Sequence, residues 1–324
     1  MKKPHIRNNI AVLDIGKTHA KVILFDSHKL KELEVFQTEN IILTDSLYPH
    51  FDIESLKEFI INSLSNLAKK YIVDSIFTST HGACMALMTK GELALPYFEN
   101  GKHFGSRIEI LDDYLFVSIG ERGKGMIAQD PSNSIGSIIR IHKNGEYPED
   151  NPFLTNNEWL PELFQIGVRN PQGMTLDPQT NSIYISNHGP KGGDFIGKVV
   201  GGSNFGWKKI GWGGTNYSGT KIGDGNAWEP GFIKPDFIWV PSIAVSGIKF
   251  YQGEAFPEWQ NSLLVSSLKF QYLSVLHRKG NKFVKEEVIF KDKIGRVRDI
   301  EIDQLGNIYI ITDETDSNLF VLKP

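Results

Sequence analysis

The residues best suited to chemistry lie at both ends of a short strand-turn-strand pattern near the middle of the chain. Arg169-Asn170 precedes the first predicted strand, 173–177, and a turn-rich run, 188–194, follows the second predicted strand, 183–186. Gly-Pro and Gly-Gly steps in that run hold the backbone in tight turns and direct carbonyl or amide groups outward. Outward carbonyl groups suit a hard cation and amide groups suit an anion, whereas each glycine taken singly is more typical of an ordinary loop.

Three further basic side chains lie beside predicted turns in the same way: Lys269, Arg296 and Arg298. Each one taken alone is typical of a solvated surface charge. If repeated hairpins brought all of them next to Arg169, the cations would repel one another unless an anion lay between them. Their shared placement at strand ends therefore predicts an anionic cofactor.

A second polar turn joins the predicted strands 10–13 and 20–25 near the start of the chain. Its tip carries Asp14, Gly16, Lys17 and Thr18. Backbone donors there could approach a phosphate, and the carboxylate could hold its magnesium ion. The residues alone favour the plainer interpretation, which is a polar hairpin tip.

Composition narrows the class of protein. The chain has 324 residues, long enough for two domains, with the 40% hydrophobic and 23% charged content of a globular protein. Its net charge of −3 offers no basic surface for nucleic acid, and the single cysteine, Cys84, excludes a disulfide framework and a cysteine-based zinc site. No apolar run reaches the roughly 18 residues of a membrane span. The start of the chain lacks the apolar core of a signal peptide, so a cytoplasmic protein is expected.

The chain changes character near residue 100. Before that point, Asp52 is placed to cap a helix whose apolar residues follow helical spacing from Leu56 to Ala68. After it, four strand-turn-strand stretches echo one another and are each followed by a further strand: 107–120, 173–187, 246–268 and 298–313. Repeats of about 40–50 residues are typical of propeller blades, and a stacked sandwich is the competing fold.

Residues 1–100 carry four short motifs: DIGKTHAKVILFD (14–26), YPHFD (48–52), STHGA (79–83) and GELALPYFE (91–99). Together they resemble the start of the FGGY sugar kinase family. The resemblance implies an α/β, actin-like (ribonuclease H-like) fold for ATP and Mg²⁺, with His81 and Gly82 near the sugar. It places four residues in the first phosphate motif: Asp14, Gly16, Thr18 and Lys21. No later kinase motif follows residue 100, so we expect no kinase turnover.

Nine motifs carry a second resemblance: HFGSRI (103–108), SIGERG (118–123), AQDPSNSIGSIIRI (128–141), DNPF (150–153), VRNPQGM (168–174), HGPKGGD (188–194), SNFGW (203–207), WVPSIAVSGIKFY (239–251) and RVRD (296–299). Together they resemble the soluble aldose sugar dehydrogenases of the glucose/sorbosone dehydrogenase family, over residues 101–324. The resemblance implies a mainly β fold, here a partial six-bladed β-propeller of about four blades. It also implies pyrroloquinoline quinone and Ca²⁺ as cofactors, an aldose oxidised to its lactone, and a separate electron acceptor. That family works in the periplasm.

Matched by motif, the resemblance makes His103 the general base, taking the sugar hydroxyl proton while hydride passes to the quinone. Glu121 stands where the family often has aspartate and would orient the imidazole. Arg169 and Asn170 would contact the quinone, with Arg169 counted among the catalytic residues.

The resemblance assigns the remaining site residues to the metal and the cofactor. The carbonyl groups of Gly189 and Pro190 would ligate calcium. Further cofactor contacts would come from Lys269, Arg296, Arg298 and, covering the quinone plane, Trp239.

The dehydrogenase resemblance begins next to His103, and about two blades that should precede it are replaced by the kinase-like segment. We therefore expect either a fusion of two truncated genes or an assembly error, in which cofactor contacts from the missing blades are lost; a truncation of this kind can abolish activity. Two other functions stay open. One is sugar phosphorylation by residues 1–100, and the other is sugar binding without catalysis.

Overall fold

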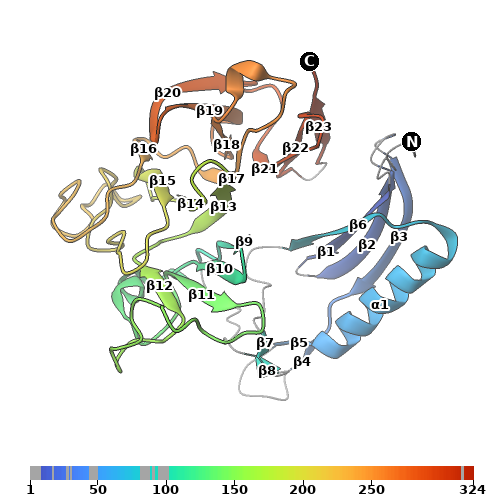
Figure 1. Cartoon of the computed structure of the whole chain (residues 1–324), viewed down its shortest axis with the longest axis horizontal. Coiled ribbons are helices and arrows are strands. Elements are labelled where there is room, and N and C mark those ends of the chain that lie inside the picture. Colours follow the sequence, from blue (N-terminus) through green and yellow to red (C-terminus); the bar gives the residue numbers. More distant parts are fainter. Residues whose placement is uncertain are drawn as a thin grey trace. The chain divides into compact units, whose positions relative to one another are not determined.

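The computed structural model describes residues 9–16, 18–26, 29, 31–43, 50–80, 88–89, 92–93, 102–314 and 317–324. The chain forms two compact units, Met1–Asn100 and Gly101–Pro324. Figure 1 shows the described part of the first unit in blue and cyan, and the second unit from green to red.

The first unit contains a four-stranded sheet in the order β3-β2-β1-β6. Strands β1 (Asn9–Ile15), β2 (His19–Asp26) and β3 (Lys31–Glu39) are antiparallel, and β6 (Ser75–Thr80) runs parallel to β1. Helix α1 is Ile53–Lys70. The remaining described strands form two short pairs, β4 (Ile42–Leu43) with β5 (His50–Phe51) and β7 (Met88–Thr89) with β8 (Glu92–Leu93).

Alternation and capping explain the first unit. Val22 and Leu24 lie on one face of β2 because side chains alternate along a strand, and both are fully buried in a cluster with Leu67 of α1. The carboxylate of Asp52 accepts the Ser55 N–H at 3.0 Å, which is the predicted helix cap. The actin-like kinase fold stays a prediction for this unit. Within the described residues, no helix combines the length and the hydropathy needed to cross a membrane.

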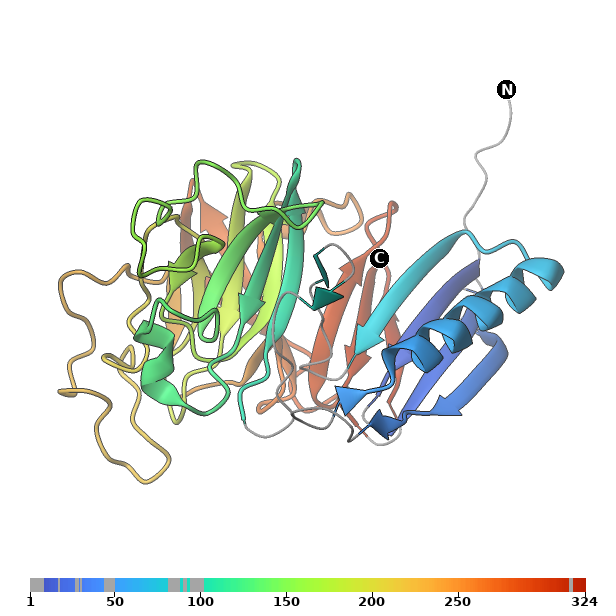
Figure 2. The same ribbon diagram turned by 90° about the horizontal axis from the view of Figure 1, so that it is seen from below.

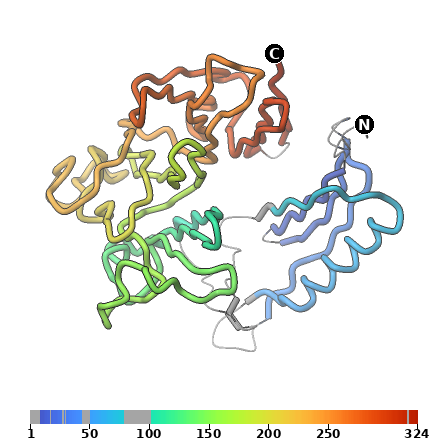
Figure 3. The backbone as a smooth tube through the Cα atoms, in the orientation of Figure 1, coloured from blue at the N-terminus to red at the C-terminus, as the bar shows by residue number. Residues whose placement is uncertain are grey.

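The described residues of the second unit form four antiparallel sheets that follow one another along the chain, whose path Figure 3 traces from green to red. The first sheet has β9 (Ser106–Leu111), β10 (Tyr114–Ile119), β11 (Ser137–His142) and β12 (Leu163–Ile166). The second has β13 (Pro171–Asp177), β14 (Ser182–Asn187), β15 (Asp194–Lys198) and β16 (Phe237–Trp239). The third has β17 (Val245–Phe250), β18 (Leu263–Ser267), β19 (Tyr272–Lys279) and β20 (Lys282–Ile289). The fourth has β21 (Val297–Ile302), β22 (Ile308–Thr312) and β23 (Leu319–Leu322).

These sheets confirm that the region is mainly β and propeller-like. Each of the four predicted strand-turn-strand stretches forms the first two strands of one sheet. Two short 3-10 helices, η1 (Gly125–Gln129) and η2 (Pro257–Trp259), lie in the connections. Residues 199–236, gold in Figure 2, join β15 to β16 and form a long loop that contains turns and no strand.

In each of the four sheets of the second unit, the start of the first strand pairs with the end of the second strand. These pairs are Ser106 with Ile119, Pro171 with Asn187, Val245 with Ser267, and Val297 with Thr312. The first strands β9, β13, β17 and β21 contact one another in that order. The loops at these strand ends therefore gather at one end of the second unit, which we call the site end.

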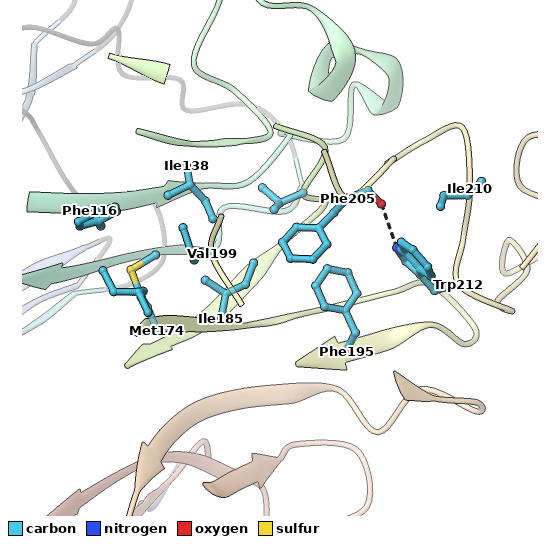
Figure 4. Packing of buried hydrophobic residues seen from close by; sticks show 11 residues of the cluster. Phe116, Ile138, Met174, Ile185, Phe195, Val199, Phe205, Ile210 and Trp212 are labelled. Carbon is cyan, nitrogen blue, oxygen red and sulfur yellow. Dashed lines mark hydrogen bonds between the residues drawn. The ribbon is translucent and has the colours of Figure 1, made fainter. Parts of the chain in front are cut away.

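Buried aromatic and aliphatic side chains fix the first sheet against the second (Figure 4). The rings of Phe195 and Phe205 lie 4.8 Å apart, and Trp212 Nε1 donates to the carbonyl oxygen of Phe205 at 2.9 Å. Ile138 and Ile185 are fully buried beside them. Burying each such side chain contributes about 1.5–3 kcal/mol, so this cluster holds together the two sheets that carry His103 and Arg169.

A buried ion pair joins the second sheet to the third. Arg278 Nη1 lies 2.7 Å from Asp177 Oδ2, and the two side chains are only 3% and 1% exposed. Asp177 ends β13, so this ion pair lies away from the site end.

Candidate active site

The site end carries most of the residues predicted to act in the dehydrogenase. Each residue lies within three residues of the start of a first strand or of the end of a second strand: His103, Glu121, Arg169, Asn170, Lys269, Arg296 and Arg298. Their positions follow from the common strand direction of the four sheets.

His103 and Glu121 are in direct contact through imidazole Nδ1 and carboxylate Oε1. The other carboxylate oxygen, Oε2, accepts the Gly125 N–H at 2.6 Å. Burial alone would raise the pKa of Glu121, but the hydrogen bonds from His103 and Gly125 outweigh it and lower that pKa. An ionised Glu121 makes Nδ1 the donor, so Nε2 holds the lone pair that can accept a proton. The His103 side chain is 19% exposed and can be reached, whereas that of Glu121 is 1% exposed.

Arg169 is a buried cation held by carbonyl groups. It is 4% exposed, and its Nη1 donates to the carbonyl oxygens of His188 at 3.1 Å and Gly189 at 3.0 Å. Its guanidinium lies 5.2 Å from the ring centre of Trp207, and its Nε has no hydrogen-bond partner among the described residues. Burial lowers the pKa of Arg169, although the electrostatic effects of nearby Tyr217 and Glu121 oppose this. A buried, incompletely paired guanidinium is a site where an anionic group would be stabilised.

Asn170 connects the first and second sheets. Its side-chain oxygen accepts the Gly105 N–H at 2.8 Å and the Gln172 amide at 3.0 Å. A Cβ on Gly105 would lie 2.1 Å from the Pro171 carbonyl oxygen, so only glycine allows this approach. The Glu121 N–H donates to the Arg169 carbonyl oxygen at 2.9 Å, which brings the His103 pair beside Arg169.

Two more guanidinium groups share one carboxylate at the start of the fourth sheet. Arg296 and Arg298 each donate to Asp313 Oδ2 at 2.9 Å, and Arg298 also donates to Gln172 Oε1 at 3.2 Å. Burial opposes ionisation of Asp313, but the bonds and charges of both arginines outweigh it and lower its pKa. Two positive charges therefore face one negative charge. Hydrogen bonds through Asp313, Gln172 and Asn170 therefore link the two arginines to Gly105, two residues from His103.

Lys269 and Trp239 have contacts of another kind. The exposed Lys269 ammonium lies 4.9 Å above the Phe270 ring, and its described contacts do not include the arginines. Trp239 is 6% exposed and donates from Nε1 to Glu286 at 3.0 Å within the hydrophobic cluster of the second and third sheets. Packing accounts for these contacts, and the cofactor roles of both residues stay predictions.

The calcium-ligand roles of Gly189 and Pro190 stay predictions. The Gly189 carbonyl oxygen accepts from the Arg169 guanidinium at 3.0 Å, and a carbonyl oxygen has two lone pairs. Pro190 is buried in the same turn, where the Gly189 N–H donates to Asp194 Oδ1 at 2.7 Å. Among the residues that the structure describes, no group of three or more His, Cys, Asp or Glu side chains could hold a metal ion.

The kinase-like residues lie in the first unit. Asp14 and Lys21 pair across β1 and β2, and the Gly16 N–H donates to the His19 carbonyl oxygen at 2.9 Å. Thr18 lies in the same exposed turn, which is the polar hairpin tip favoured from the residues alone. Lys17, His81 and Gly82 are outside the described residues, so the ATP and Mg²⁺ site stays a prediction.

Sequence reasoning missed several residues that hold the site together: Arg122, Gly125, Gln172, Asn187, Trp207 and Asp313. Asn187 Oδ1 accepts the N–H groups of both Arg169 and Asn170, at 3.0 and 2.9 Å. Asp313 ends the last predicted hairpin, and its position after a strand was the one available signal. Its two arginine partners lie close in sequence but become neighbours only because β21 and β22 pair.

Comparisons with known proteins agree with this geometry. The glucose/sorbosone dehydrogenase family matches residues 92–321. The aldose sugar dehydrogenase YliI of Escherichia coli is 37% identical over 232 residues, covering 71% of this chain and 62% of that protein. Quinoprotein glucose dehydrogenase B of Acinetobacter calcoaceticus is 26% identical over 118 residues, covering 31% of this chain and 24% of that protein.

A solved structure resembles most of the chain. The apo form of the soluble aldose sugar dehydrogenase from Escherichia coli has a TM-score of 0.68 and 29% identity, covering 94% of this chain and 78% of that one. The chain spans 62% and 56% of the lengths of two curated relatives that it matches. The family match covers well over half of the chain, and the chain therefore belongs to the glucose/sorbosone dehydrogenase family.

Proposed function

We propose that the second unit binds pyrroloquinoline quinone and oxidises an aldose to its lactone, with His103 as the base. One observation carries the proposal. An imidazole oriented by a buried carboxylate lies in one contact network with the buried, incompletely paired guanidinium of Arg169. The names of the relatives from Escherichia coli and Acinetobacter calcoaceticus, an aldose sugar dehydrogenase and a quinoprotein, support the same chemistry.

The charges at the site end fit an anionic cofactor. Arg296 and Arg298 share the single carboxylate of Asp313, and Arg169 is held by carbonyl oxygens. Charge-assisted bonds from guanidinium to carboxylate groups are among the stronger hydrogen bonds in proteins. We therefore assign Arg169, Arg296 and Arg298 to the oxygens and carboxylates of the quinone, with Asn170 bracing the backbone beside them.

The protein's own part in the reaction is to hold the sugar hydroxyl and take its proton. His103 Nε2 accepts the O–H proton, and ionised Glu121 stabilises the imidazolium that results. When bound, the quinone supplies the acceptor for the hydride from the same sugar carbon, so that carbon loses two electrons and a lactone remains. A separate electron acceptor restores the quinone.

We keep Ca²⁺ as the second proposed cofactor, with the carbonyl oxygens of Gly189 and Pro190 as its ligands. The Gly189 carbonyl oxygen accepts from the Arg169 guanidinium at 3.0 Å, and its two lone pairs allow a second partner. Titration of the protein with Ca²⁺, with and without the quinone, tests this assignment.

Dye reduction with purified full chain, quinone and an aldose tests the proposal. We expect turnover in the wild type, loss of turnover but not of quinone binding in His103→Gln, and no effect of His277→Gln. His277 is a matched control because its Nε2 also contacts a carboxylate, Glu287 Oε2 at 2.8 Å, on β19 and β20. Turnover that is unchanged in His103→Gln would refute the assignment of the base. Sugar binding without quinone and independent of His103 would instead favour the non-catalytic binding module.

A kinase function of the first unit is the second candidate. The observation behind it is the connection through α1 to β6, which pairs parallel to β1. It predicts ATP-dependent sugar phosphorylation that Asp14→Ala abolishes. The origin of the chain as a fusion of two truncated genes also stays a prediction.

A further inference from the structure

The arginine that follows Glu121 in sequence braces the backbone of His103. Arg122 Nη1 donates to the carbonyl oxygen of His103 at 3.0 Å and to that of Gly120 at 3.1 Å. The guanidinium also lies 5.3 Å from the ring centre of Phe104. One side chain therefore joins the segment that carries the imidazole to the segment that carries its carboxylate partner.

The backbone at His103 needs such support. His103 has φ of 62°, a left-handed conformation that costs free energy for a residue other than glycine and persists only where its surroundings hold it. Its carbonyl group lies against Gly120, where an added Cβ would be 2.0 Å from the His103 oxygen. The nearby backbone hydrogen bond from the Lys102 N–H to the Arg122 carbonyl oxygen is long, at 3.5 Å.

The carboxylate is fixed independently of the imidazole. Glu121 is anchored by the Gly125 N–H at 2.6 Å and by its own N–H on the Arg169 carbonyl oxygen at 2.9 Å. The position of the His103 imidazole relative to the Glu121 carboxylate therefore depends on how the 102–105 segment is held. Arg122 supplies two of the contacts that hold it.

We propose that Arg122 is a positioning residue for the His103–Glu121 pair, acting through the His103 carbonyl group. Its kinetic consequence rests on the proposed dehydrogenase function, whereas its structural consequence does not. Loss of the brace lets the imidazole drift from its partner. Small misplacements of a catalytic group cost about 10- to 100-fold in rate.

The test compares Arg122→Gln, Arg122→Met and Arg122→Lys with Arg140→Gln as a matched control. Arg140 lies on β11 of the same sheet, and its Nε donates to Asn151 at 2.7 Å. Proton NMR of the protein without quinone should show a downfield imidazole N–H resonance, assigned to His103 by its loss in His103→Gln. We expect this resonance in the wild type, Arg122→Lys and Arg140→Gln. We expect this resonance to broaden or vanish in Arg122→Gln and in Arg122→Met. Wild-type tryptophan emission identifies which of these two variants is folded and can be compared.

Kinetics complete the test. In the quinone-loaded protein, kcat should fall about 10- to 100-fold in the same variants, with the Kd for quinone unchanged and Arg122→Lys restoring most of the rate. A sharp His103 resonance in Arg122→Gln or Arg122→Met would overturn the proposal, and so would a raised KM with unchanged kcat, which marks a substrate contact. If the resonances behave as expected but no protein turns over, the proposed function fails while the positioning role stands.

Discussion

Replacing Glu121 by alanine tests what its carboxylate contributes to stability and to the orientation of His103. The carboxylate is 1% exposed and accepts from His103 Nδ1 and from the Gly125 N–H. Each buried donor left without a partner costs about 1–3 kcal/mol, so the loss of both bonds should lower the free energy of unfolding by about 2–6 kcal/mol.

The loss in rate follows from the same contacts. A hydrogen bond to a charged group contributes about 1.5–3 kcal/mol, and here it strengthens as the imidazole takes up a proton. Removing it should therefore lower kcat by about 10- to 100-fold at saturating quinone and sugar. The KM for sugar should change little, because Glu121 is too deeply buried to touch the substrate.

Tryptophan emission and dye reduction measure the two effects separately. All six tryptophans lie after residue 100, so their emission during urea unfolding reports the second unit alone. Glu287→Ala is the control, because it removes the partner of His277, is 38% exposed and lies outside the site. A folded Glu121→Ala protein with wild-type kcat would refute the idea that this carboxylate orients the base.

Two further predictions concern stability. Asp177→Asn should lower the free energy of unfolding of the second unit by about 3–5 kcal/mol, because Arg278 would remain as a buried, unpaired charge. The double change Asp177→Leu with Arg278→Met should lower it much less. Equal losses for the two proteins in urea unfolding would contradict this prediction. Burial raises the pKa of Tyr184 to about 12. Because the unfolded tyrosine titrates near about 10, the stability that neutral Tyr184 contributes is complete below pH 10 and is lost as pH rises through about 12. Tyr184→Phe should lose less stability than the wild type over that interval, and an identical pH dependence would count against a buried, neutral phenol.

The strand pattern and the strand ends could be predicted from sequence for physical reasons. Alternating apolar residues between turns define a strand by themselves, and the four repeated hairpins set a common strand direction. That direction places His103, Arg169 and Arg298 at one end without any knowledge of their contacts.

The partners of the charged residues could not be predicted in the same way. Arg298 meets Gln172 across 126 residues, and Arg169 takes backbone carbonyl oxygens as its acceptors. Such contacts depend on how separate sheets pack, and no local spacing encodes them. Trp239 illustrates the same limit. A tryptophan can cover a flat cofactor or pack between two sheets, and here it packs between sheets.

The most direct measurement is calorimetric titration of pyrroloquinoline quinone into the full chain in the presence of Ca²⁺. Wild type and Arg140→Gln should bind with the same Kd, and Arg169→Gln and Arg298→Gln should each bind about tenfold or more weakly, because each loses a charge-assisted hydrogen bond. Folded wild-type protein that takes up no quinone, or an equal Kd in all four proteins, would contradict an anionic guest held by these guanidinium groups.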